Sequence, residues 1–63
     1  MERESTITVT LPDDQAVALA QLCKRIGWND CRSLAVDDAE ARLMIAATDM
    51  LAGALREAGF AVR

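Results

Sequence analysis

The chain has 63 residues, a formal net charge of −3 and no histidine. A domain of this size buries only about 60% of the surface that its unfolded chain exposes, so we expect stabilisation by a disulfide, a metal or a partner subunit. Two cysteines without histidine do not complete a tetrahedral zinc site, and the acidic balance disfavours nonspecific attraction to phosphate backbones. The composition therefore predicts one domain, residues 1–63, without metal or cofactor and with protein partners.

The two cysteines leave one alternative open. A disulfide between Cys23 and Cys31 would staple the fold, but Cys23 lies inside a helical pattern and a free cysteine behaves as a small buried apolar residue. We therefore favour reduced thiols, as is usual inside the cell. Oligomerisation is then the expected source of extra stability.

The N-terminal residues indicate the cellular compartment in which we expect the protein. Residues 1–6 are mixed in charge and precede only a short apolar stretch, so they lack the basic and apolar regions of a signal peptide. The longest apolar run is interrupted by Arg42, Asp49 and Arg56, and it falls short of the roughly 18 residues that a membrane span requires. We expect a cytoplasmic protein that does not bind membranes.

Hydroxyl and aliphatic residues alternate strictly over residues 6–11, and all but Leu11 are β-branched. A period of two in β-branched residues is typical of a half-buried strand. The pattern predicts an N-terminal strand with Ile7, Val9 and Leu11 toward a core.

A helix is predicted over about residues 12–26. Pro12 suits the first helical position, and Asp13 and Asp14 fall in the first turn, where the helix dipole favours negative charge. Gly27 is a natural residue just beyond the C-terminal end. Both ends of this helix are therefore marked.

A connector over residues 28–36, with room for one short helical turn, leads to a second helix over about residues 38–58. Asp37 has the position of an N-cap, with Glu40 three residues later, and Gly59 ends the segment. The start and the end of the second helix are thus both marked by capping residues.

The second helix has a narrow polar face. Arg42, Asp49 and Arg56 recur every seven residues, while apolar residues occupy most of the circumference. A helix with so wide an apolar arc must be covered on more than one side. We expect a homodimer of a small β-α-α domain, fold class α+β, with an interface formed by Ala47, Met50, Leu51 and Ala54.

No residue set supports catalysis. Nucleophilic cysteine or serine chemistry needs a base such as histidine, which is absent. The acidic residues fall at predicted helix N-termini, where capping accounts for them; they are Asp13, Asp14, Asp37, Asp38 and Glu40. The Trp28 side chain either anchors an interface with a partner or fills the small core between the helices. The sequence predicts a binding protein and not an enzyme.

The N-terminal half resembles the ribbon-helix-helix family, through residues 6–14 and a helix that ends in residues 24–27. In that family two strands pair across a dimer and enter the DNA major groove. The resemblance implies DNA contacts by the strand threonines and a nearby cation, namely Thr6, Thr8, Thr10 and Arg3. Ordinary strand composition explains the same threonines, so both interpretations stay open.

The second half departs from that family. The connector is longer, the second helix is nearly twice the usual length, and its start carries carboxylates at Asp37, Asp38 and Glu40. Such carboxylates would repel the phosphates that the family grips there. A ribbon-helix-helix repressor or antitoxin is therefore the alternative hypothesis, and DNA is a partner only under it.

Over its whole length the chain resembles an uncharacterised group of short proteins from proteobacterial plasmids and phages. The shared segments are residues 11–16, 19–21, 24–25, 28, 32, 35–37, 40–41 and 55–60. This resemblance implies an interaction module of a mobile element that binds a host protein complex, such as an anti-CRISPR-type inhibitor. The acidic residues would then form its binding surface, with Trp28 as an aromatic contact. A third hypothesis is a small subunit that completes a larger assembly.

Overall fold

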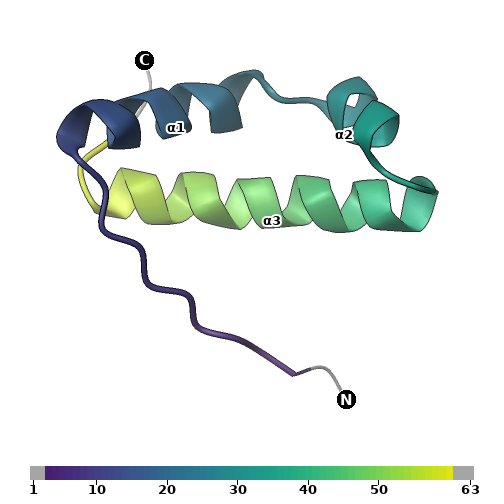
Figure 1. The fold of residues 1–63 in the computed structure, drawn as a ribbon, viewed down its shortest axis with the longest axis horizontal. Coiled ribbons are helices and arrows are strands. Elements are labelled where there is room, and N and C mark those ends of the chain that lie inside the picture. The colour runs from purple at the N-terminus through teal and green to yellow at the C-terminus, as the bar shows by residue number, and fades with distance from the viewer. Residues whose placement is uncertain (1–2, 61–63) are drawn as a thin grey trace.

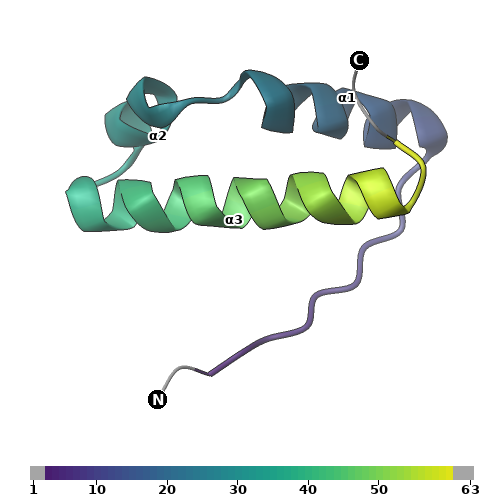
Figure 2. The ribbon, with the colours of Figure 1, turned by 180° about the vertical axis from the view of Figure 1, so that it is seen from behind.

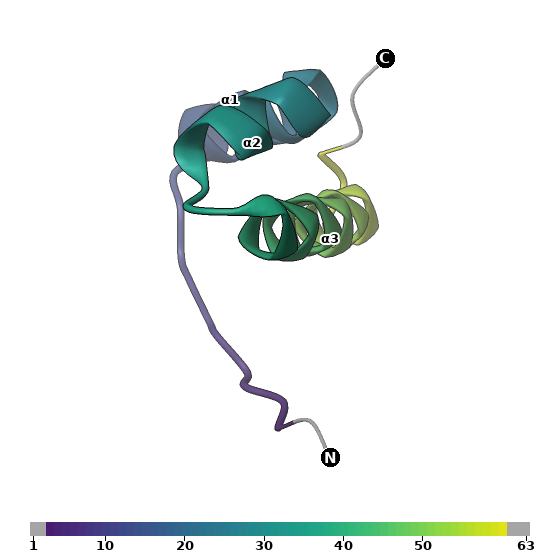
Figure 3. The ribbon, with the colours of Figure 1, turned by 90° about the vertical axis from the view of Figure 1, so that its right-hand side faces the viewer.

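The computed structural model describes residues 3–60 and contains three helices: α1 (Asp13–Arg25), α2 (Trp28–Leu34) and α3 (Asp38–Glu57). α1 and α2 follow one another along one side of α3, so that they form one layer and α3 the other (Figures 1 and 2). Viewed from the end, the two layers are clearly separate, and the N-terminal segment runs past α3 and away from it (Figure 3).

The predicted α+β class is wrong, because residues 3–60 contain helices and no strand. Residues 6–11 are extended but belong to no sheet, and they are exposed apart from the half-buried Leu11. A β-strand is defined by its hydrogen bonds to a neighbouring strand, and residues 3–60 contain no strand that could pair with this segment. The predicted N-terminal strand is therefore not formed within residues 3–60.

α1 starts and ends within one residue of its predicted bounds. Pro12 precedes the first helical residue, and its carbonyl accepts the first helical hydrogen bond, from the Ala16 N–H at 3.0 Å. Asp13 and Asp14 occupy the first turn, as expected. The helix gives way to extended backbone at Ile26.

α2 lies where the sequence predicted a connector with at most one helical turn. Gly27 donates its backbone N–H to the Asp30 carboxylate at 2.8 Å, which fixes the start of the helix. Cys31 is almost fully buried. A seven-residue helix spans fewer than two turns, so its apolar residues show too little periodicity to identify it.

α3 begins with the predicted N-cap at Asp37, but the Glu40 carboxylate bonds the residue before the N-cap and so does not complete a capping box. The Glu40 N–H donates to Oδ1 of Asp37 at 2.9 Å, and the Glu40 carboxylate accepts the Val36 N–H at 3.1 Å. At the other end Gly59 has a positive φ of 98°, and the Phe60 N–H returns to the Leu55 carbonyl at 2.8 Å. This left-handed turn is the Schellman-type end that a glycine permits.

The core lies between the two layers and is small. Its buried residues among those described are Ala16, Ala20, Cys31, Ala41 and Leu55. Four of these side chains are small, so α1 and α2 can approach α3 closely, but little apolar area is removed from water. No helix within residues 3–60 is long and apolar enough to cross a membrane.

Candidate protein-interaction surface

An apolar hollow lies where the N-terminal segment passes α1 and α3. Its volume is about 600 Å³, and its lining is apolar, comprising Ile7, Val9, Leu11, Leu19, Leu51, Ala54 and Leu55. Ile7 and Val9 are 82% and 65% exposed. Large aliphatic side chains are thus open to solvent around a concave surface.

A second hollow of about 320 Å³ continues along α3. It is lined by Ile26, Cys31, Leu34, Met44, Ala47, Thr48 and Leu51. Leu51 lines both hollows, and Leu22 lines two shallower grooves that join them on the α1 and α2 side. We call the two hollows together with Leu22 the apolar face.

The interface residues predicted on α3 are exposed and gather on this side. Ala47, Leu51 and Ala54 line the hollows, and Met50 lies on the neighbouring strip of α3 with 78% of its surface exposed. The dimer itself stays a prediction, since one chain is described. The structure also places the N-terminal segment, together with Leu19 and Leu22 of α1, on the apolar face. The helical periodicity of α3 did not reveal these contributions.

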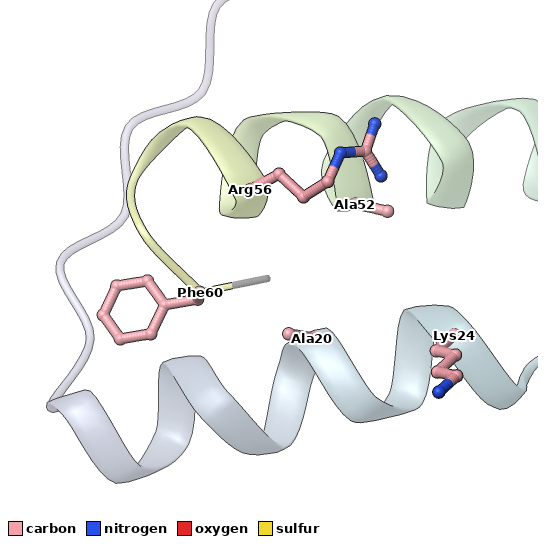
Figure 4. Close-up of a pocket in the computed structure, with 5 residues that line it drawn as sticks. All are labelled: Ala20, Lys24, Ala52, Arg56 and Phe60. Carbon is pink, nitrogen blue, oxygen red and sulfur yellow. The ribbon is translucent and has the colours of Figure 1, made fainter. Parts of the chain in front are cut away.

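A third hollow, between α1 and α3, is much smaller. It is lined by Ala20, Lys24, Ala52, Arg56 and Phe60 (Figure 4), and its volume is about 120 Å³. Sites for small organic ligands usually measure about 300–1,000 Å³. This hollow is therefore too small for a cofactor or for a segment of a partner protein.

The acidic residues do not form one surface. Asp13 and Asp14 lie at the start of α1, whereas Asp37, Asp38 and Glu40 lie at the start of α3, at the opposite end of the molecule (Figure 1). The second group also has structural contacts. Asp37 caps α3, the Glu40 carboxylate accepts the Val36 N–H, and Asp38 pairs with Nε of Arg32 at 2.5 Å.

The model of a protein family of unknown function, DUF7706, matches residues 1–63. The chain belongs to this family. No curated protein and no solved structure matches it. The expected whole-chain likeness to an uncharacterised family is therefore confirmed for DUF7706, while an origin in plasmids or phages stays a prediction.

The residues of the DNA-binding alternative lie along one segment of the DUF7706 chain. Arg3, Thr6, Thr8 and Thr10 are all exposed on the extended backbone that precedes α1. Their role in DNA binding stays a prediction. Trp28 begins α2 and is 42% exposed, so it does not serve as a fully buried plug.

The cysteine side chains of the DUF7706 chain are described for both Cys23 and Cys31. Cys23 is half-buried in α1, Cys31 is buried in α2, and no disulfide joins them in the described residues. Within residues 3–60, no group of three or more potential metal-binding side chains comes together.

The capping role of Asp37 gives a direct test. Replacing Asp37 with alanine removes the acceptor for the Glu40 N–H and should lower the free energy of unfolding by about 1 kcal/mol. Asp37→Asn keeps an acceptor and should stay near wild type, because asparagine caps helices about as well as aspartate. Urea unfolding followed by circular dichroism measures both. Equal losses in the two variants would show that charge, and not the cap, stabilises α3.

Proposed function

We propose that this DUF7706 chain is a non-enzymatic protein-interaction module that acts by docking its apolar face against another protein surface. The observation that carries the proposal is the continuity of exposed aliphatic side chains from Ile7 and Val9 across Leu51 to Leu34. Contiguous apolar patches larger than a few hundred Å² are rare on monomers and mark binding surfaces.

The energetics favour occupation of this face. Full burial of one aliphatic side chain of leucine size stabilises a complex by about 1.5–3 kcal/mol relative to exposure. The other flank of α3 carries Arg42, Asp49 and Arg56, which are all exposed and polar. The asymmetry between the two flanks of one helix gives the module a defined binding side.

The finer form of the proposal is an inhibitor from a mobile element that occupies a site on a host protein complex. The apolar face supports this function better than the acidic residues do, because the two acidic groups lie at opposite ends of the molecule. A partner that contacts acidic residues would therefore meet the group at the start of α1 or the group at the start of α3, but not both. For α3 the contact would involve Asp37, Asp38 and Glu40.

A capture experiment with matched variants tests the role of the face. Leu34→Gln with Leu51→Gln alters two exposed residues of the apolar face, and Arg42→Gln with Asp49→Gln alters two exposed residues of the polar flank without changing net charge. All four side chains are exposed, so both variants should keep the helical circular dichroism of the wild type. We expect the first variant to bind at least about 100-fold more weakly to whatever protein the wild type retains.

The readout is the set of proteins that each immobilised variant retains from a bacterial host lysate, and from a solution of the chain itself carrying a second tag. The polar-flank variant should match the wild type in both solutions. Identical retention by the wild type and the Leu34 and Leu51 variant would refute a binding role for the face.

A further inference from the structure

The apolar face is a groove that runs along α3. Its lining residues on α3 lie three or four positions apart and so share one side of the helix. They are Met44, Ala47, Thr48, Leu51, Ala54 and Leu55. This stretch covers about three helical turns, or about 16 Å. Leu19 of α1 and Leu34 of α2 belong to the other wall, which follows the same length of α3 (Figure 1).

The second hollow offers little to the backbone of a partner. Within the described chain its lining includes one hydroxyl, that of Thr48, which donates inside α3 to the carbonyls of Met44 at 2.6 Å and Ile45 at 3.0 Å. The backbone of α3 along the groove is paired within the helix. An extended peptide lying there would bury unpaired N–H and C=O groups, which is costly. A helix pairs these groups internally, so it suits the groove.

The extended backbone of residues 6–10 does not change this conclusion. Ile7 and Val9 line the hollow beside α1, and no residue of the N-terminal segment lines the second hollow. An extended partner that followed the N-terminal segment would therefore leave Met44 and Leu34 exposed. A partner that covers both hollows must follow α3.

The charges around the groove favour a basic partner. Glu40 precedes Met44 by four residues and Ala47 by seven, so it lies on the same side of α3, where the groove ends. Asp30 and Arg25 flank the groove on the side of α2 and α1, and their charges offset one another. The whole chain carries a net charge of −3. Such a charge attracts a basic partner and disfavours a second copy of the chain.

We propose that the occupant of the apolar face is an amphipathic helix of another protein, with lysine or arginine on its polar side. This proposal rests on the proposed function and names the kind of partner. A helix of about three turns matches the length of the groove, with apolar side chains at positions i, i+3, i+4 and i+7 facing it. Ala47 and Ala54 are exposed and small, so they let such a helix approach α3 closely.

Two synthetic peptides of the same composition test the helical form of the partner. Both contain leucine and lysine over about 15 residues, long enough to form a helix. One has its leucines at helical spacing, and in the other leucine and lysine alternate, so that it is amphipathic only when extended. Fluorescence anisotropy of the labelled peptides should show at least about tenfold tighter binding of the helical peptide. Equal or tighter binding of the alternating peptide would overturn the proposal.

A third peptide tests the charge of the partner. It carries glutamate in place of every lysine of the helical peptide. We expect it to bind at least about tenfold more weakly at low ionic strength, and the difference should shrink as salt is added. Equal binding of the lysine and glutamate peptides would overturn the basic side of the proposed helix.

A pair of adjacent substitutions tests the place of binding. Ala47→Gln puts a longer side chain on the floor of the groove, and Ala46→Gln makes the same change at a residue that lines neither hollow. Both alanines are exposed, so both variants should keep the circular dichroism of the wild type. Ala47→Gln should weaken binding of the helical lysine peptide at least about tenfold, whereas Ala46→Gln should bind it as the wild type does. Equal effects would overturn the placement in the groove.

Sedimentation of the chain alone tests the second copy as a competing occupant. A dimer that Ala47→Gln dissociates would overturn the proposal, because the second copy would then fill the groove. A monomer, or a dimer that Ala47→Gln leaves intact, keeps the groove free for the helix, as the proposal requires.

The proposed function fails separately from this inference. If Leu34→Gln with Leu51→Gln loses the captured protein but the wild type shows no preference for the helical peptide, the helix is overturned and the role of the face stands. If that variant retains the same proteins as the wild type, the role of the face is overturned, whichever peptide binds.

Discussion

Replacement of Leu55 by alanine should lower the free energy of unfolding by about 2–5 kcal/mol, the range for truncating a buried leucine. Leu55 is 9% exposed, and it is the only large aliphatic side chain among the buried residues of the described structure. It lies near the end of α3, where that helix packs on α1 (Figure 1). Since small domains are stable by only several kcal/mol, a large fraction of the variant should be unfolded.

Leu43→Ala is the matched control for Leu55→Ala. Leu43 lies on the same helix but is 71% exposed, and substitutions at such surface positions usually change stability by less than about 0.5 kcal/mol. Both variants should be unfolded in urea at one protein concentration, so that any dependence of stability on self-association is the same for both. Equal losses would mean that Leu43 is covered as completely as Leu55.

The ends of α1 and α3 could be predicted from the sequence because their determinants are local. Asp37 and Gly59 perform their predicted roles within a few residues of themselves, whereas Pro12 is the N-cap of α1, one residue before the predicted first helical position. Capping depends on spacing along the chain and not on the fold. The same reasoning explained the acidic residues correctly as helix-start residues.

The N-terminal strand and α2 could not be predicted in the same way. The alternation in residues 6–11 favours extended backbone, but a sheet requires a second strand, and residues 3–60 contain none. α2 is too short to show a helical period. In both cases the missing information is a contact between distant parts of the structure.

The candidate surface was only partly predictable for the same reason. The wide apolar arc of α3 indicates that another surface covers it, and its predicted interface residues are indeed exposed. The sequence does not show that Ile7 and Val9 lie beside Leu19, because this requires the path of the N-terminal segment past α3. Nor does it show that the two acidic groups lie at opposite ends.

A larger side chain in the core should also lower the free energy of unfolding strongly, and Ala41 is the best position at which to test this. Ala41 is fully buried in the first turn of α3, the part over which α2 packs (Figure 1). Ala41→Leu adds three carbon atoms where the layers meet, and overpacking of this kind costs about 1–3 kcal/mol. Ala46→Leu makes the same change at an exposed position of α3 and should leave stability within about 0.5 kcal/mol of wild type.

The loss in Ala41→Leu should be concentrated in α2. A seven-residue helix has almost no stability without tertiary contacts, so α2 should unfold once the larger side chain displaces it from α3. Amide hydrogen exchange should therefore show faster exchange throughout residues 28–34, while α1 and the second half of α3 keep their protection. Unchanged exchange in α2 would contradict the argument, because it would mean that the layers do not depend on small residues for their close approach.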